Sequence, residues 1–342
     1  MTRTMLGGSA PVASPGGCAA PQASPRMPNR NTLIGALRFI GFPHTGSLQK
    51  GRGQDMAAEE VRYERRGPVA VLTLDRARYH NAQSWKLLDD LDRQLDRAMA
   101  DEDVRVVVLK GDGRHFSSGH DLGTPEQQAD IEARGLTQWV GMDWYEAFRW
   151  YNLDNTVKWR NLPKPTIAMV HGYCIFGGWM IAASMDLIFA SPSARFLASL
   201  FETFTVPWDI HPRKAKELLF ESRFIDAEEA RELGLVNRVY AEDELERETM
   251  AYAERIAEND PAVLRLGKLA VNKAQDAMGY SANVEAAFAD YLVVREIRGS
   301  FSRVEGNRRL VGVDLALRGQ RGGRAGQTPV DTVSASEARE DA

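Results

Sequence analysis

The sequence predicts an α/β fold in which helices cover a sheet. Short runs of β-branched and apolar residues recur along the chain, and each ends at a glycine or polar turn before a segment with helical spacing. The 342 residues, 44% of them hydrophobic, can bury a large core. Between about residues 61 and 298 the sequence contains neither an internal repeat nor a domain boundary. We therefore expect one continuous α/β domain with tails.

The first predicted elements are a strand, a helix and a second strand. Val69–Leu74 is a β-branched run that the polar residues 75–81 interrupt. Ser84 fits the N-cap of a helix in which apolar residues recur at helical spacing up to Met99. Residues 104–110 form the second buried strand, which ends at a glycine turn.

The later elements continue this order. Residues 116–122 are expected to form a short strand and turn, and Thr166–Val170 a third strand. The nearly uncharged segment 179–185 must be internal if it is helical, and residues 186–190 give a fourth strand. Residues 260–298 carry amphipathic helices whose apolar faces cover the core or a neighbouring subunit.

The two ends of the chain differ in composition from its middle. Residues 1–55 are rich in Gly, Ser, Pro and Ala, which indicates a disordered leader or a misassigned start, with Met56 the natural beginning. The globular core is then expected over residues 56–259 and a helical region over 260–317. Residues 318–342 lack apolar periodicity and are predicted to be a disordered tail.

Charge and cysteine content exclude several classes of protein. The net charge of −4 comes from interspersed acids and bases, so we expect no nucleic-acid partner and no membrane partner. No apolar run reaches the roughly 18 residues of a membrane span. Cys18 and Cys174 are the only cysteines, so a reducing cytoplasm fits better than a disulfide framework. No metal-ligand cluster is present in the sequence, and no metal is expected.

Five segments, taken in order, resemble the enoyl-CoA hydratase/isomerase (crotonase) family. They are residues 78–82, residues 116–122, Lys164 and Pro165 leading to Gly172, Gly177 and Gly178 with Asp186 eight residues later, and residues 226–237. The resemblance implies a crotonase-like spiral of ββα units with a C-terminal helical region, assembled as a homotrimer or a dimer of trimers. It also implies an acyl-CoA thioester substrate and no cofactor, because CoA is part of the substrate.

Two glycine turns fit the chemistry that this resemblance implies. A thioester carbonyl that gains negative charge needs two preorganised donors, and backbone N–H groups serve without reorientation. Gly177 precedes the uncharged helix, so its N–H can be one donor, and its missing Cβ lets a ligand approach; it can also be a simple helix-start glycine. By the resemblance, the N–H of His120 is the second donor. The His120 side chain is either a satisfied polar group or a general base.

The resemblance also assigns contacts to the substrate. Arg78 and Arg114 lie in the family's nucleotide-contacting turns, where they meet CoA phosphates or serve only surface solubility. Asp121 is expected to cap or orient its turn. The other substrate contacts that the resemblance implies are His80, Ala82, Ser118, Leu122, Phe176, Met180 and Leu200.

The catalytic positions depart from the family. Hydratases place one carboxylate on each side of the pocket, but here Met180 and Leu200 occupy those two positions. Glu202 is a substitute for the second carboxylate, because two residues along an extended chain return a side chain to the same face. Asp209 and His211 lie in a shortened segment and could also supply an acid or base. A solvated loop glutamate, a helix-capping aspartate and a surface histidine are the alternative interpretations.

Three functions remain open. An enoyl-CoA hydratase or isomerase of fatty acid metabolism would use Glu202, Asp209 or His211, and the matching motifs favour it. A relative with dehalogenase- or thioesterase-like chemistry would use a carboxylate such as Asp209 as a nucleophile. A non-catalytic acyl-CoA-binding subunit would use none of these residues.

Overall fold

The computed structural model describes residues 59–135, 141–198 and 205–302, the side chains of 297–302 excepted. The predictions for residues 1–55 and 318–342, for Leu200 and for Glu202 therefore lie outside the described residues.

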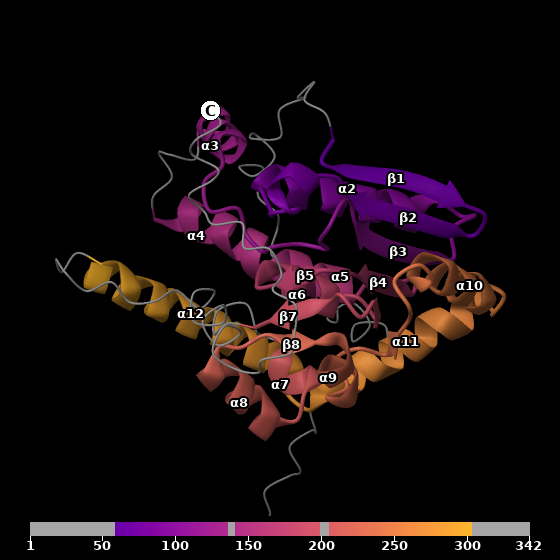
Figure 1. The fold of residues 1–342 in the computed structure, drawn as a ribbon. Helices are drawn as coiled ribbons and strands as arrows, with labels where there is room; N and C mark the ends of the chain where they lie inside the picture. The colour runs from indigo at the N-terminus through magenta and orange to yellow at the C-terminus, as the bar shows by residue number, and fades with distance from the viewer. Residues whose placement is uncertain (1–58, 136–140, 199–204, 303–342) are drawn as a thin grey trace, which may run out of the picture. The chain divides into compact units, whose positions relative to one another are not determined.

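The larger sheet of the described chain has six strands in the order β1-β2-β3-β4-β6-β9. Its first strands, β1, β2 and β3, lie side by side in Figure 1. The strands are β1 (Val61–Arg66), β2 (Val69–Leu74), β3 (Val106–Gly111), β4 (Thr166–Val170), β6 (Leu187–Ala190) and β9 (Arg238–Val239). The first two form an antiparallel pair, and the other neighbours run parallel.

A smaller sheet, with three strands among the described residues, has the order β5-β7-β8. Its strands are β5 (Tyr173–Ile175), β7 (Arg195–Leu197) and β8 (Ile225–Asp226). The chain passes from β4 to β5 and then to helix α6 (Gly177–Ala183), and next from β6 to β7 and a further helix. This repeated course of two strands and a helix is the ββα unit that the sequence led us to expect.

Helices cover both faces of the larger sheet. Helix α2 (Trp85–Ala100) packs on β1 and β2, and α10 (Leu245–Ala257) packs on β2, β3, β4 and β6. Alternate residues of β2 belong to two different cores: Ala70 and Leu72 face the core that includes α2, whereas Val69 and Val71 face the core that includes α10. Parallel strands buried in this way are typical of α/β proteins.

The remaining helices lie between the strands and in the C-terminal region of the chain. They are η2 (Ala77–Tyr79), α3 (Pro125–Ala133), α4 (Met142–Arg149), the π-helical η4 (Trp150–Asp154), α5 (Asn155–Arg160), α7 (Val206–Asp209), α8 (Pro212–Glu221), α9 (Ala227–Glu232), α11 (Pro261–Ala277) and α12 (Tyr280–Ser302). Among the described residues, no helix is both long and apolar enough to cross a bilayer.

Several element boundaries agree with the sequence and others do not. The strands Val69–Leu74 and Thr166–Val170 occur as expected, and Ser84 caps α2 by accepting from the Leu87 N–H at 3.0 Å. The second strand begins at Val106, two residues late, because the Val104 N–H closes a turn onto Asp101. Helix α6 begins two residues earlier than expected.

The expected short strand over residues 116–122 is wrong. Only two isolated bridges form there, one between Gln83 and His120 and one between Ser117 and Cys174. The reason is Gly119, whose φ of +92° turns the chain out of an extended course.

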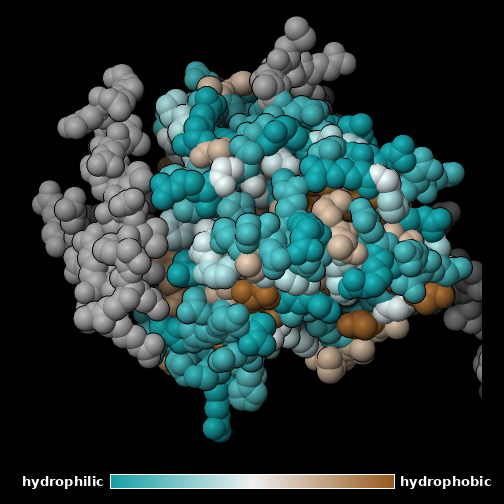
Figure 2. Space-filling view, turned by 45° about the vertical axis from the view of Figure 1, so that its right-hand side comes forward, coloured by the Kyte–Doolittle hydropathy of each residue, from teal (hydrophilic) through white to brown (hydrophobic). Residues whose placement is uncertain are grey.

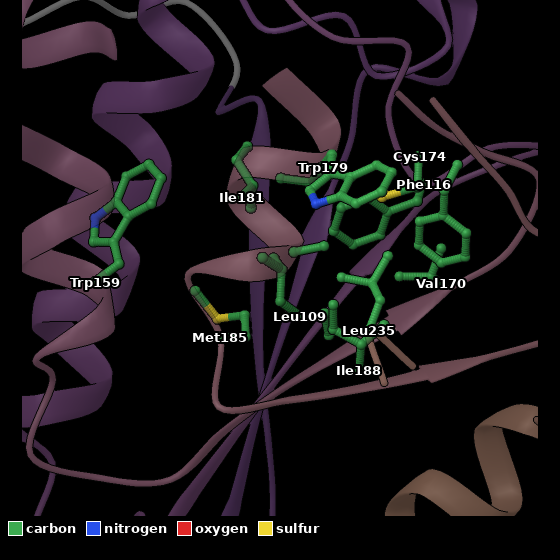
Figure 3. Packing of buried hydrophobic residues seen from close by; sticks show 14 of the residues in the cluster. Leu109, Phe116, Trp159, Val170, Cys174, Trp179, Ile181, Met185, Ile188 and Leu235 are labelled. Atoms are coloured by element: carbon green, nitrogen blue, oxygen red, sulfur yellow. The ribbon is translucent and has the colours of Figure 1, made fainter. Parts of the chain in front are cut away.

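Helix α6 is internal, as its lack of charge predicts. Trp179 is 1% exposed and lies beside Phe116 and Cys174 in the core (Figure 3). Burial of α6 in this core fixes the helix and holds its first residues in place.

On the face of the molecule in Figure 2, apolar residues form separate small patches among hydrophilic ones.

Candidate active site

The turn that ends at His120 is held by buried hydrogen bonds. The Ser117 hydroxyl donates to the Asn81 carbonyl over 2.8 Å. It accepts from the Gly119 N–H at 3.2 Å and from Gln83 Nε2 at 3.3 Å. Ser117, Asn81 and Gln83 are all buried. The backbone of His120 is therefore fixed, while its N–H has no acceptor among the described residues.

A second turn meets the first at the start of α6. Phe176 adopts φ 51° and ψ −118°, and its N–H donates to the Leu197 carbonyl over 2.9 Å. The Gly177 N–H lies in the first turn of the helix, where no helical carbonyl can accept it. A Cβ on Gly119 would lie 3.0 Å from Phe176 Cβ and 3.4 Å from Gly177 N, so the turns are in contact. The structure thus places Gly119, the residue before His120, in contact with the start of α6.

The side of Gly177 that a Cβ would occupy is filled, which corrects the expectation of a close ligand there. A Cβ would lie 2.4 Å from Gln83 Oε1 and 3.1 Å from His120 Cε1. Residue 177 is therefore glycine because Gln83 and His120 pack against it. A ligand must reach the Gly177 N–H from another direction.

The His120 imidazole is uncharged at neutral pH. Burial lowers its pKa to about 4. Its Nε2 is buried without a hydrogen-bond partner among the described residues, although the residue as a whole keeps some exposed surface. A ring with this pKa is a weak base, so its contribution at the site is a neutral polar group.

The two expected phosphate ligands differ in what they already bind. Arg78 is exposed and forms an ion pair with Glu126 at 2.9 Å. Arg114 is also exposed, and the described residues offer it no ion pair. Burial and the Arg114 charge together lower the pKa of His80, whose ring lies edge-on to His115 at 4.9 Å. Arg114 is therefore the more available cation.

The two motif-bearing turns lie side by side. The Ser118 N–H donates to the His80 carbonyl over 3.0 Å. The Ala82 carbonyl accepts from Arg76 Nη1 at 2.9 Å. This places Ser118, His80 and Ala82 along one strip of backbone next to the turn that ends at His120.

Asp121 orients its turn through a buried ion pair. Its side chain is 0% exposed, and Oδ2 lies 2.7 Å from Nη1 of Arg76, itself 1% exposed. Burial opposes the charge, but hydrogen bonds from Thr124, Gly123 and Arg76 lower the pKa of Asp121 below its ordinary value. The side chain of Leu122, the next residue, is 97% exposed.

Met180, one helical turn after Gly177, lies in an apolar cluster. Its buried members are Phe148, Leu153, Met180, Tyr280, Val284 and Phe288, and Trp208 packs against them. The buried members come from α4, η4, α6 and α12, and Trp208 comes from α7. Met180 is therefore surrounded by apolar and aromatic side chains, several of them from the C-terminal helix.

Asp209 ends α7 beside that cluster. Burial raises the pKa of its carboxyl to about 7. The Thr205 hydroxyl and the Arg160 charge act in the opposite direction. Asp209 Oδ2 and Thr205 Oγ1 are both buried, and neither has a hydrogen-bond partner among the described residues. Trp208, the residue before Asp209, packs against the Met180 cluster and lies 5.4 Å from the Tyr280 ring, so α7 carries Asp209 to the edge of this cluster.

His211 lies on the surface. It is the N-cap of α8, and its Nδ1 accepts from the Arg213 N–H at 3.4 Å. The contacts of His211 therefore give it a structural role as a helix cap. Of the candidate acids and bases among the described residues, Asp209 is the one that lies beside the apolar cluster.

The comparisons with known proteins agree with this geometry. A sequence model of the enoyl-CoA hydratase/isomerase family matches residues 64–289, more than half of the chain. The chain belongs to this family. Its fold is that of crotonase-type enzymes, and the protein is an enzyme of that class acting on a CoA thioester.

Individual relatives show how far the similarity extends. EchA13 of Mycobacterium tuberculosis, described as a putative enoyl-CoA hydratase, is 39% identical over an alignment of 251 residues, and the match covers 67% of this chain and 79% of that one. A Mycobacterium smegmatis structure described as a probable enoyl-CoA hydratase is 36% identical with a TM-score of 0.64, covering 72% of this chain and 98% of its own. A monofunctional enoyl-CoA isomerase from M. smegmatis is 26% identical with a TM-score of 0.52, covering 66% and 98%.

Sequence reasoning missed two residues that shape the site. Gln83 adjoins the residues 78–82 motif, yet nothing in its type indicates that it packs against Gly177. Arg76 reads as a surface charge after a strand, but the structure buries it against Asp121. A polar residue directly beside a matching motif is the only signal that could have suggested Gln83.

Proposed function

We propose that the protein shifts the double bond of an enoyl-CoA thioester, with the His120 and Gly177 N–H groups polarising the carbonyl and Asp209 moving the proton. The observation that carries the proposal is the Asp209 carboxyl. It has a buried oxygen without a partner among the described residues and a pKa of about 7. A carboxyl that is half ionised at neutral pH can both accept and return a proton.

The reaction follows from these groups. Asp209 as carboxylate removes a proton from C2 of a 3-enoyl-CoA, and the electron pair moves onto the thioester oxygen. The two backbone N–H groups stabilise that oxyanion. The neutral Asp209 then returns the proton to C4, the double bond moves to C2–C3, and the oxyanion returns to a carbonyl. Only one acid–base group is needed, and the isomerase among the structural relatives supports this choice.

Hydration of a 2-enoyl-CoA is the second candidate. EchA13 and the Clostridium acetobutylicum short-chain-enoyl-CoA hydratase, 30% identical over 68% of this chain and 87% of that one, carry this activity in their names. Hydration needs a group to activate water and a group to protonate carbon. Glu202 would have to join Asp209 for that purpose.

Nucleophilic chemistry is less well supported. Nucleophilic attack needs an aspartate that stays ionised until it bonds to carbon, whereas a pKa of about 7 suits a carboxyl that gains and loses a proton. A non-catalytic binding subunit would gain nothing from a buried carboxyl that costs stability. Both alternatives therefore rank below proton transfer.

The CoA end of the substrate is assigned to the surface turns. Arg114 would pair with a phosphate, with Arg78 as a weaker partner because Glu126 competes for it. The strip that contains His80, Ala82 and Ser118 would hold the rest of the nucleotide, and Leu122 and Phe176 would contact the pantetheine arm. We propose that no cofactor is needed beyond the CoA of the substrate.

Assembly and location are part of the same proposal. Val263, Leu266, Val271 and Met278 are exposed along or just after α11, and such a stripe is expected to be covered by another subunit. A homotrimer or a dimer of trimers would cover it. The cytoplasm, with fatty acid metabolism as the setting, fits the two cysteines without a disulfide framework.

The test compares isomerisation of 3-hexenoyl-CoA and hydration of 2-hexenoyl-CoA in the parent and in Asp209→Asn, Asp209→Glu, Glu202→Gln and His211→Gln. Asp209→Asn should lower kcat/KM by about 10²- to 10⁴-fold while hexanoyl-CoA still binds, and Asp209→Glu should recover part of it. Asp243→Asn, which changes an exposed aspartate, is the matched control. Isomerisation by Asp209→Asn within threefold of the parent would reject the proposal. A loss only in Glu202→Gln would transfer the role to Glu202.

A further inference from the structure

Arg160 is a buried cation that packs on Tyr280, the ring that the helix bearing Asp209 also contacts. It ends α5 and is 8% exposed. Its Nη1 lies 3.2 Å from Asp276 Oδ1, and its Nη2 donates to the Asn272 carbonyl at 3.1 Å and to Gln275 Oε1 at 2.9 Å. All three partners belong to the last turns of α11. The guanidinium is therefore fixed by the end of that helix.

Tyr280 connects Arg160 to the neighbourhood of Asp209. The Arg160 guanidinium carbon lies 4.0 Å from the centre of the Tyr280 ring. On α7, Trp208 contacts the same ring at 5.4 Å, and its Nε1 donates to Asn283 Oδ1 at 2.9 Å. The junction between α11 and α12 thus holds the cation and the carboxyl-bearing helix against one buried tyrosine.

The polar and charged groups that surround Asp209 come from four elements. The Thr205 hydroxyl lies directly before α7, the helix that ends at Asp209. Arg160 comes from α5 and Tyr280 from α12, and Asp276 on α11 acts on both of them. Arg160 is the cation of this set, and it lowers the pKa of Asp209 against the larger effect of burial. Its ion-pair partner, Asp276, has a side chain that is 38% exposed. Solvent therefore screens Asp276, and much of the Arg160 charge remains available to Asp209.

We propose that Arg160 is a positioning residue that supplies the positive charge Asp209 needs to exist as a carboxylate beside an apolar cluster. The end of α11 holds Arg160, so the C-terminal helices set the acid–base behaviour of the site. The inference rests on the proposed role of Asp209. Arg160 contacts no substrate in this account and acts only through the aspartate.

The experiment measures kcat/KM for 3-hexenoyl-CoA isomerisation from pH 5 to 9. In the parent the rate should rise with pH as Asp209 ionises. Arg160→Gln should move this rise to higher pH by about one unit, so that kcat/KM falls about tenfold at pH 6 and little at pH 9. Arg160→Lys, which keeps the charge, should recover most of the parent profile. Asp276→Asn should move the rise to lower pH, because it removes the anion that competes for Arg160.

The outcomes separate this inference from the proposed function. A folded Arg160→Gln variant with the parent's pH profile, while Asp209→Asn is inactive, would overturn the inference alone. Full activity in Asp209→Asn would overturn both. If Arg160→Gln does not fold, Asp276→Asn decides: a rise at lower pH supports the role of Arg160, and an unchanged rise rejects it.

Discussion

Asp209→Asn should stabilise the folded protein above neutral pH. Burial raises the pKa of this carboxyl to about 7 from the ordinary value of 3.8. At about 1.4 kcal/mol for each pKa unit, that difference corresponds to at most about 4 kcal/mol of free energy of unfolding. Asparagine has a similar size and cannot ionise, so it removes the cost.

The sign of the pH dependence follows from proton binding. Between about pH 4 and pH 7 the unfolded chain has released this proton while the folded protein retains it, so the stability of the parent falls as pH rises. Below pH 4 both states are protonated at residue 209, and above pH 7 both have lost the proton. The gap between Asp209→Asn and the parent should therefore widen from pH 4 to 7 and then stay constant.

Urea unfolding at a fixed protein concentration, from pH 4 to 9, measures this gap, with Asp243→Asn as the control for an exposed aspartate. The variant should gain several kcal/mol over the parent at pH 8 and about none at pH 4. A gap that does not change with pH would show that Asp209 is ionised normally and would refute the argument.

Three further substitutions test the frame of the site. Asp121→Ala leaves Arg76 buried without its closest anion and should lower the free energy of unfolding by about 3–5 kcal/mol; a change below 1 kcal/mol in urea unfolding would show that the pair is not needed. Gly177→Ala should weaken acyl-CoA binding in calorimetric titration, because the new Cβ would clash with the Gln83 carboxamide. Adding Gln83→Ala to this variant should restore binding, and no recovery would mean that the clash is elsewhere. Ser84→Ala removes the cap of α2 and should cost about 1 kcal/mol in thermal melting, and an unchanged Tm would argue against the cap.

Much of the frame could be predicted because its signals are local. Val69–Leu74 and Thr166–Val170 are short β-branched runs bounded by turns, and Ser84 has the residue type and position of an N-cap. The glycine turns could be matched to a family because backbone geometry restricts which residues can occupy them. The prediction of a strand over residues 116–122 was wrong because the positive φ of Gly119 overrides the strand preference of the neighbouring residues.

The chemistry of the site could not be predicted in the same way, because it depends on burial. The sequence offers Asp209 only as one of three candidate acids or bases, with a helix-capping aspartate as the alternative, and its raised pKa arises from burial that the folded chain creates. Arg160 and Arg76 likewise look like surface charges until the fold buries them. Long-range packing decides which of these side chains are buried, and a local sequence pattern does not encode it.

The most direct test of the central claim is exchange of the C2 protons of butanoyl-CoA in D₂O, followed by mass spectrometry. This saturated thioester cannot isomerise, so exchange reports only carbonyl polarisation and proton removal. Exchange is expected with the parent and, with Asp209→Asn, at a rate at least about 100-fold lower at equal binding. Exchange by Asp209→Asn at the parent's rate, or no exchange by a parent that binds the thioester, would contradict the central claim.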